Sequence, residues 1–280
     1  MIERLESRRL LSVTFDRGVI TILGTTGPDS VEVAEGAPEE NLIRIVYNAQ
    51  QFDFPRDQVV RIDASLSDGP DLFIAGSIDV AVHVKGGRGD DSLSGGDADD
   101  TLLGEGGFDY IFGRAGDDSL VGGIQNDLIL GAAGDDWIVP YSFGTGDDTI
   151  SGGAGFDTID YSGNDNGVYV SIEPNPDEQV VEDVIRPDVE RVIGSNSNDT
   201  MINLTKRGMI FEGGPGNDTL IGGSGNDTLI GGPGLDLLRG FGGADRFGVA
   251  DGESDTVFGG SGSDTLLDDA DLSDLLSEIP

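Results

Sequence analysis

The chain has 280 residues, and its 53 acidic side chains against 16 basic ones give a net charge of −37. A charge of this size excludes a protein that holds nucleic acid through phosphate contacts, and it disfavours binding to anionic membranes. The chain has no cysteine and a single histidine, His83, so disulfide bonds and the usual ligands of zinc or copper are not available. No segment approaches the roughly 18 apolar residues of a membrane-spanning helix.

Residues 1–14 are predicted to be an N-terminal tail or an export motif. The apolar step at Leu10 and Leu11 is too short for a secretory signal peptide. The string LESRRLLS is similar to a short N-terminal motif of some large exported bacterial proteins. A disordered tail is the alternative.

Residues 15–85 predict a β-rich N-terminal cap and the first rungs of a longer β-structure. Apolar and polar residues alternate over stretches such as 19–23 and 80–84, which is typical of strands. The strings GTTGPDSVE and LSDGPDLFI place Asp29 and Asp71 two residues before an apolar side chain. A small separate β-sandwich is the alternative interpretation.

Residues 86–139 consist of six consecutive nine-residue repeats, GGRGDDSLS, GGDADDTLL, GEGGFDYIF, GRAGDDSLV, GGIQNDLIL and GAAGDDWIV. Glycine opens every repeat, Asp holds the sixth place, and an aliphatic residue holds the eighth. The x-U-x that ends each repeat, where U is the aliphatic residue, predicts a very short strand with its middle side chain buried. Such a strand is not stable alone, so the repeats must stack and share a core.

The first six places of each repeat predict a calcium-binding turn. Glycine allows a positive φ and a close approach of the backbone, so that carbonyl oxygens can surround an ion. The sixth-place Asp adds a carboxylate. Calcium requires 6–8 oxygen ligands at about 2.3–2.6 Å, and carbonyls together with Asp provide oxygen ligands only.

The pattern matches G-G-x-G-x-D-x-U-x, and the chain resembles the RTX, or haemolysin-type, calcium-binding family. The resemblance implies an all-β fold, a right-handed parallel β-roll or β-solenoid of stacked short strands. Two nonapeptides would form one coil, so that residues 18 apart lie on neighbouring coils. Asp91 and Asp109 would then follow one edge, and Asp100 and Asp118 the other. Each ion would lie between two stacked turns and bind Asp side chains and carbonyls of both.

The remaining chain is divided by the same pattern. A first array covers 86–160, with a slip of three residues after Val139. A connecting wide coil covers 161–193, where the nine-residue pattern is broken. A second array covers 194–267 and is interrupted at 203–212. An acidic cap, 268–280, is predicted to form a short helix that closes the core, and an export signal is the alternative.

The predicted calcium ligands are sixth-place acids and turn glycines of both arrays, and several ions are expected. The turns that contain Asp109, Asp127 and Asp245 are less certain ligand sites, because their glycine spacing is irregular. The predicted ligands are Gly87, Gly89, Asp91, Gly96, Asp100, Asp109, Gly116, Asp118, Asp127, Gly134, Asp136, Gly146, Asp148, Gly155, Asp157, Asp199, Gly214, Gly216, Asp218, Gly223, Gly225, Asp227, Gly232, Gly234, Asp236, Asp245, Asp255, Gly260, Gly262 and Asp264.

No catalytic motif is present in the sequence: there is no H-E-x-x-H, no G-x-S-x-G and no second histidine for acid–base chemistry. We therefore predict no enzyme, but a non-catalytic calcium-binding structural module of a secreted or cell-surface bacterial protein, which folds when it binds calcium. The alternative is a calcium-dependent adhesin or matrix protein that binds a partner through an exposed face.

Ninth-place residues point outward in this geometry, yet several are apolar. Leu103, Val121 and Val139 recur at every second repeat, so they predict an apolar column on one sheet, and Phe112 and Leu130 predict a second column. Either these side chains pack against neighbouring turns, or the column makes a calcium-dependent dimer.

Overall fold

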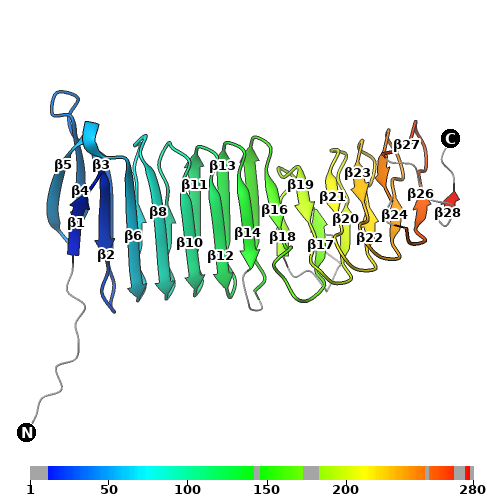
Figure 1. The fold of residues 1–280 in the computed structure, drawn as a ribbon, viewed down its shortest axis with the longest axis horizontal. Helices are drawn as coiled ribbons and strands as arrows, with labels where there is room; N and C mark the ends of the chain where they lie inside the picture. Colours follow the sequence, from blue (N-terminus) through cyan, green and yellow to red (C-terminus); the bar gives the residue numbers. More distant parts are fainter. Residues whose placement is uncertain (1–11, 142–145, 173–182, 250–251, 268–274, 278–280) are drawn as a thin grey trace, which may run out of the picture.

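The computed structural model describes residues 12–141, 146–172, 183–249, 252–267 and 275–277. Two long sheets face each other, and the chain passes from one to the other as it winds (Figure 1). The result is an all-β solenoid of about 10 turns. The all-β solenoid is the fold that the sequence predicts. The described residues contain one short 3-10 helix, η1 (Arg56–Gln58), and no α-helix.

Sheet A has 13 strands and sheet B has 15. The strands of sheet A, in spatial order, are β1 (Ser12–Asp16), β2 (Val19–Leu23), β6 (Arg61–Asp68), β8 (Ala81–Arg88), β10 (Thr101–Gly106), β12 (Ser119–Ile124), β14 (Trp137–Tyr141), β16 (Thr158–Asp160), β19 (Arg191–Ile193), β21 (Ile210–Glu212), β23 (Thr228–Ile230), β25 (Arg246–Gly248) and β27 (Thr265–Leu266). Those of sheet B, in chain order, are β3 (Ser30–Glu35), β4 (Leu42–Tyr47), β5 (Gln50–Pro55), β7 (Leu72–Ile74), β9 (Ser92–Ser94), β11 (Tyr110–Ala115), β13 (Leu128–Ala133), β15 (Thr149–Ala154), β17 (Tyr169–Ile172), β18 (Asp183–Ile185), β20 (Thr200–Asn203), β22 (Thr219–Ile221), β24 (Leu237–Arg239), β26 (Thr256–Phe258) and β28 (Leu275–Ser277).

The strand register confirms two nonapeptides per coil. Leu102 of β10 pairs in parallel with Leu120 of β12, 18 residues later, and Ile111 of β11 pairs with Ile129 of β13 in the same way. The slip after Val139 lengthens one coil, so that Leu128 pairs with Thr149. Parallel pairing therefore continues through the irregular repeat without a break in either sheet.

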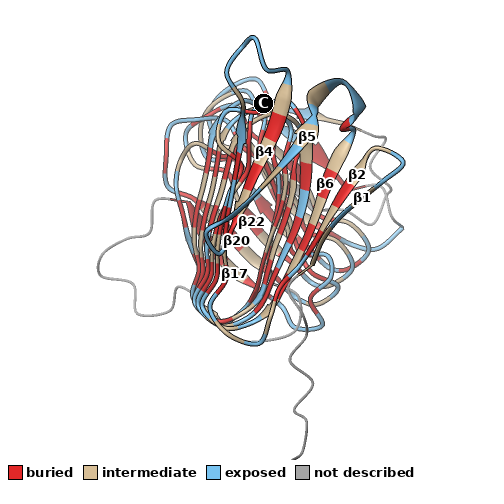
Figure 2. Ribbon diagram, turned by 90° about the vertical axis from the view of Figure 1, so that its left-hand side faces the viewer, coloured by how far each residue is buried: buried red, intermediate tan, exposed pale blue. Residues whose placement is uncertain are grey.

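The eighth-place side chains form the core between the sheets. They are fully buried in the first array and almost all of the second, and the view along the solenoid shows the buried positions on the inner faces (Figure 2). Each such side chain contributes about 1.5–3 kcal/mol of burial free energy relative to exposure. Because one strand supplies only one such residue, stability depends on stacking many coils.

The N-terminal end is closed by antiparallel strands. β1 pairs with β2, and β4 pairs with β3 and β5. The rings of Phe15 and Phe54 lie 5.5 Å apart over this end of the core. β2, β6 and β8 belong to sheet A, whereas β3 and β7 belong to sheet B. Residues of the 15–85 region are thus part of the same two sheets as the repeats.

The segment between the arrays adds two strands to sheet B. β17 and β18 are parallel neighbours, and the order β15-β18-β17-β20 shows that the chain steps back to place β18 beside β15. Residues 173–182 lie outside the described part of the structure. Both strands continue the stacking, so this segment joins the arrays through hydrogen-bonded coils.

The helix predicted near the C-terminus is wrong for the residues that are described. Leu275–Ser277 form strand β28, which pairs in parallel with β26. An open edge of sheet B favours strand pairing there, since an added strand satisfies the free backbone groups of β26. Residues 268–274 and 278–280 of the predicted cap lie outside the described residues.

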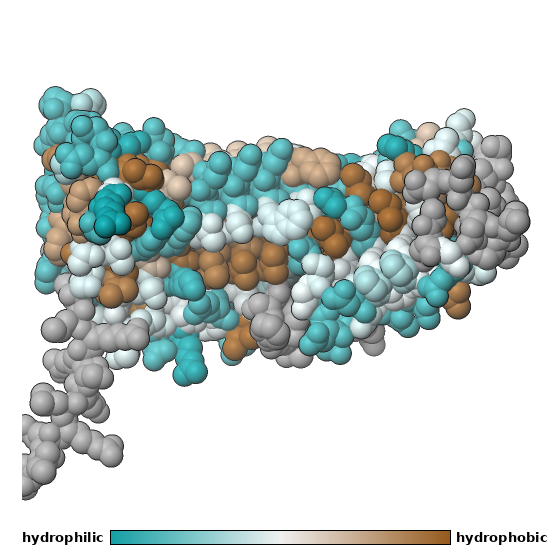
Figure 3. Space-filling view, in the orientation of Figure 1, coloured by the Kyte–Doolittle hydropathy of each residue, from teal (hydrophilic) through white to brown (hydrophobic). Residues whose placement is uncertain are grey.

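The two apolar columns expected on the outer faces are present. Leu103, Val121 and Val139 stand side by side on β10, β12 and β14, and a row of apolar surface crosses the front face in Figure 3. Phe112 and Leu130 are paired on sheet B. All five side chains are partly exposed.

Most second-place residues adopt left-handed backbone, whether or not they are glycine. Ala132 has a φ of +88° and Glu105 one of +74°, at the position that Gly87 (φ +118°) holds in the first repeat. A residue with a Cβ is less stable in this conformation than glycine by roughly 1–2 kcal/mol.

We expect Ala132→Gly to stabilise the protein by about 1 kcal/mol or less, because strain is removed while the unfolded chain gains some freedom. Ala133→Gly is the matched control: Ala133 is not among the residues with positive φ, so the same change should lower stability. Thermal unfolding at saturating calcium measures both. A lower melting temperature for Ala132→Gly would contradict the assigned strain.

Candidate metal centre

The sixth-place acids form two rows along the solenoid. We call the turns that lead into sheet B edge 1, and those that lead into sheet A edge 2. Edge 1 carries Asp29, Asp71, Asp91, Asp109, Asp127, Asp148, Asp183, Asp199, Asp218, Asp236 and Asp255. Edge 2 carries Asp100, Asp118, Asp136, Asp157, Glu190, Asp227, Asp245 and Asp264. The Asp residues of both rows are buried.

One oxygen of each acid binds the preceding coil. The N–H of Asp91 donates to Oδ1 of Asp109 at 2.8 Å, and the N–H of Asp109 donates to Oδ1 of Asp127 at 2.8 Å. On edge 2 the N–H of Asp100 donates to Oδ1 of Asp118, also at 2.8 Å. This bond repeats along both edges and makes each row a ladder of carboxylates stacked one coil apart.

The second oxygen is buried in most ladder positions and has no hydrogen-bond partner among the described residues. This holds for Oδ2 of Asp71, Asp91, Asp109, Asp118, Asp127, Asp136, Asp157, Asp218, Asp227, Asp245 and Asp264. A buried carboxylate oxygen without a partner is strongly destabilising, because desolvation is not compensated. Each of these atoms therefore marks a place where a cation would supply the missing interaction.

The turn around the free oxygen is a cradle that only glycine allows. A Cβ on the first-place Gly86 would lie 2.2 Å from Oδ2 of Asp91, and one on Gly104 would lie 2.2 Å from Oδ2 of Asp109. A Cβ on the fourth-place Gly107 would lie 1.9 Å from the carbonyl oxygen of Gly89 on the preceding coil. Carboxylate and carbonyl oxygens thus crowd the space that a side chain would fill, which is the oxygen-only donor set of calcium.

Most of the predicted ligand glycines have a φ between +20° and +160°, and three do not: Gly96, Gly146 and Gly225. Two of these still require glycine for space. A Cβ on Gly146 would lie 2.3 Å from the carbonyl oxygen of Gln125, and one on Gly225 would lie 2.3 Å from that of Arg207.

The three irregular turns keep the ladder geometry. Gln125, in the fourth place before Asp127, adopts a φ of +78°. The ladder bonds to Asp109, Asp127 and Asp245 are as short as elsewhere, at 2.8, 2.8 and 2.9 Å. The irregular glycine spacing therefore does not disrupt the turn.

Two predicted ligands, Asp100 and Asp199, differ from the rest because both of their oxygens accept hydrogen bonds. Oδ2 of Asp100 accepts the N–H of Gly96 at 2.6 Å. Oδ2 of Asp199 accepts the N–H of Ser195 at 2.7 Å, and its Oδ1 accepts the Ser195 hydroxyl at 2.8 Å.

The motif search missed two ladder acids, Asp183 and Glu190. Asp183 accepts the N–H of Asp148 at 2.7 Å, and Glu190 accepts that of Asp157 at 2.9 Å. Each stands two residues before a buried aliphatic, Ile185 or Val192. That acid-x-aliphatic spacing was the available signal, although the glycines are absent.

The fifth place also has a function that the sequence reading did not assign. Oδ1 of Asp99 accepts the N–H of Asp117 at 2.9 Å, and Oδ1 of Asn217 accepts the N–H of Leu235 at 2.9 Å. These bonds run in the opposite direction to the ladder bonds, from the later coil to the earlier one. The repeated Asp or Asn at this place was the signal.

Burial raises the pKa of many array acids far above that of a free Asp. The pKa rises to about 8 at Asp118 and Asp148, and to about 7 at Asp91, Asp109 and Asp127. Desolvation is the largest cause; the backbone N–H bonds oppose it, and neighbouring ladder carboxylates add to it. The folded chain without a cation therefore favours protonated carboxyls.

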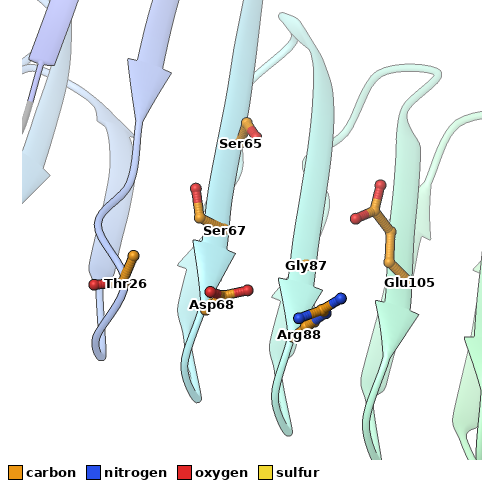
Figure 4. Close-up of a pocket in the computed structure, with 7 residues that line it drawn as sticks. All are labelled: Thr26, Ser65, Ser67, Asp68, Gly87, Arg88 and Glu105. Atoms are coloured by element: carbon orange, nitrogen blue, oxygen red, sulfur yellow. The ribbon is translucent and has the colours of Figure 1, made fainter. Parts of the chain in front are cut away.

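No group of three or more His, Cys, Asp or Glu side chains that could hold a metal occurs within the described ranges. In the repeat turns, the oxygens near the Cβ position of glycine are carboxylates and backbone carbonyls of stacked coils. A hollow of about 490 Å³ lies on four successive coils beside the predicted ligand Gly87, and Figure 4 shows Asp68, Arg88 and Glu105 among the side chains that line it. It contains none of the ladder carboxylates.

The family model of the RTX calcium-binding nonapeptide repeat matches residues 83–111, 103–138, 144–166, 212–247 and 249–270. These matches lie in both predicted arrays, leave 194–211 of the second array unmatched, and include only 161–166 of the connecting segment. A search of the curated proteins returns no match to the chain. In the described part of the chain, no helix is long and apolar enough to span a membrane.

The fold and the two ladders define a calcium-binding repeat solenoid. The chain belongs to the proteins built on RTX, or haemolysin-type, calcium-binding nonapeptide repeats, and several copies of the repeat stack within it.

We expect the chelated protein to be more stable at about pH 5 than at about pH 8. The ladder acids have folded pKa values above the unfolded value near 3.8, so the folded state binds more protons and its stability is lost as pH rises from about 4 to about 8. Calcium should reverse this trend, because it binds the deprotonated carboxylates. Urea unfolding with and without calcium measures both slopes. A stability of the chelated protein that increases with pH would contradict the prediction.

Proposed function

We propose that this chain is a non-catalytic structural module that folds when calcium binds its two ladders, within a secreted or cell-surface bacterial protein. The observation that carries the proposal is the row of buried Oδ2 atoms with no partner among the described residues. Two stacked carboxylates about 4.8 Å apart repel by roughly 1 kcal/mol even in water, and more when partly buried. A calcium ion between turns replaces this repulsion with attraction, and it adds binding free energy to the folded state only.

A structural role is supported by the surroundings of the single histidine. His83 lies on the outer face of sheet A, with its Nδ1 3.7 Å from Oδ1 of Asp63, and its side chain is 45% exposed. The buried acids serve as ladder rungs, which accounts for them without a reaction. Secretion is proposed from the repeat type, whose members are typically exported by bacteria.

Calcium should convert a largely unfolded chelated chain at about pH 8 into the β-solenoid, in a cooperative titration followed by circular dichroism. Magnesium should require a much higher concentration, because it prefers a rigid octahedron at about 2.0–2.1 Å and retains its water. Equal midpoints for the two ions would show that charge screening is the cause. An unchanged β spectrum and melting temperature after chelation would refute the proposed function.

The apolar column on sheet A favours a second candidate function, in which an exposed face binds a partner or a second copy of the chain. Leu103, Val121 and Val139 lie at paired positions on three adjacent strands, and Lys85 on β8 borders them. A continuous apolar strip on a folded surface often marks an interaction site.

If the column binds a second copy, light scattering should detect a dimer in calcium. Replacement of Leu103, Val121 and Val139 by Ser should then abolish the dimer and leave calcium binding intact. Replacement of Thr101 and Ser119, which lie on the same face, by Ala is the control and should leave the dimer unchanged. A monomer at high protein and calcium concentrations would exclude self-association through this face.

A further inference from the structure

The ladder acids of the connecting segment differ from those of the arrays in what surrounds their second oxygen. Asp183 continues edge 1 and Glu190 continues edge 2, each through a hydrogen bond from the preceding coil. Neither has a glycine turn like that of the repeats before it. In both, the second oxygen binds a side chain of the protein.

Arg207 provides the positive charge at Glu190. Its Nη2 donates to Oε1 of Glu190, while its Nη1 donates to the carbonyl oxygen of Pro187. The guanidinium thus joins a carboxylate to a backbone carbonyl, which are the two kinds of oxygen that meet in each calcium turn. Glu190 is only 19% exposed, so this charge-assisted pair is partly shielded from solvent.

The interruption of the second array at 203–212 is the loop that positions Arg207. Asn203 folds the loop by accepting the N–H of Thr205 at 2.9 Å and donating to the carbonyl oxygen of Arg207, also at 2.9 Å. The N–H of Arg207 donates to the Thr205 hydroxyl at 3.0 Å. The loop is therefore ordered by its own side chains, and the arginine extends from a fixed backbone.

On edge 1, neutral groups donate hydrogen bonds to the carboxylates of Asp183 and Asp199. The Tyr161 hydroxyl donates to Oδ2 of Asp183 at 2.5 Å, and both residues are at most 5% exposed. Ser195 donates its N–H and its hydroxyl to Asp199. At these positions the protein itself satisfies the oxygen that lacks a partner in the repeats on either side.

We propose that residues 158–172 and 183–212 form a metal-independent clamp between the arrays, in which Arg207, Tyr161 and Ser195 replace calcium. The inference rests on the proposed function, because it defines which rungs of the ladders need no ion. The clamp has its own core, with Val170, Ile185 and Val192 buried. It would remain folded when calcium is removed and would provide an edge on which each array re-forms.

Hydrogen exchange of the full chain in chelator and in calcium tests the clamp. In chelator at about pH 8, clamp amides should exchange at least about tenfold more slowly than those of 86–139 and 213–249, because local stability differs by 1.4 kcal/mol for each factor of ten. In calcium all three regions should be protected. Equal exchange of clamp and arrays in chelator would overturn the clamp.

Two variants test the replacing groups. Arg207→Gln and Tyr161→Phe should each raise clamp exchange in chelator by about tenfold or more, since the first removes the charged partner of the partly buried Glu190 and the second leaves an oxygen of the buried Asp183 unpaired. Arg191→Gln is the matched control, because Arg191 pairs with Glu212 at 2.7 Å on the outer face, and it should have little effect. If Arg207→Gln does not fold even in calcium, Tyr161→Phe alone decides. Unchanged exchange in Tyr161→Phe would overturn the proposal.

The number of calcium ions bound by each variant distinguishes a failure of the clamp proposal from a failure of the proposed function. Glu190→Gln and Asp183→Asn should bind as many ions as the wild type, whereas Asp218→Asn, whose Oδ2 lacks a partner among the described residues, should bind fewer. A loss of ions in the first two variants would overturn the clamp. A wild type that binds no calcium would refute the proposed function, and the exchange experiment in chelator would still test the clamp.

Discussion

The structure depends on the sixth-place carboxylate, which is buried and faces in two directions. Its Oδ1 fixes the preceding coil through a backbone N–H, whereas its Oδ2 points into the glycine turn. The hydrogen bond of Oδ1 fixes how the coils stack, and this stacking removes the carboxylate from water. In most ladder positions, the Oδ2 atom has no partner among the described residues that offsets its lost hydration, and a bound cation would provide one. The calcium dependence that we propose would therefore be a property of the stacking itself, because stacked coils bury these oxygens.

The repeat could be recognised from the sequence because its regular nine-residue spacing places equivalent residues at equivalent positions of each coil. Glycine, Asp and an aliphatic residue at fixed places predicted the calcium-binding turn and the buried eighth place, and the resemblance to the RTX family implied the two-per-coil register and the two rows of acids. Asp183 and Glu190 were missed because the search required glycine turns, and these acids are held by Tyr161 and Arg207. Such partners lie 17 to 22 residues away in the chain, so only the coil geometry brings them together.

The C-terminal error has a different physical origin. Leu275 and Leu276 fit one face of a helix, but the chain there meets the open edge of sheet B and pairs with β26. A tertiary template overrides a local apolar pattern when free backbone groups are available for hydrogen bonding. The hydrogen bonds of the fifth-place Asp and Asn were missed for a simpler reason. In the sequence these residues look like ordinary exposed polar side chains, and only the stacking of the coils shows that they accept backbone N–H groups.

The direction of the ladder bond makes the two ends of the solenoid chemically different. Within each array, a ladder acid donates its N–H toward the C-terminal end and accepts at its carboxylate from the N-terminal side. The first acid, Asp29, has no earlier rung, and Thr25 and Asn48 donate to it in place of one. Contact between two such ladders end to end would therefore be head to tail, because the donor end of one row meets the acceptor end of the other. At the N-terminal end, β1 occupies the edge of β2, so an antiparallel strand stands where another repeat coil would stack on sheet A.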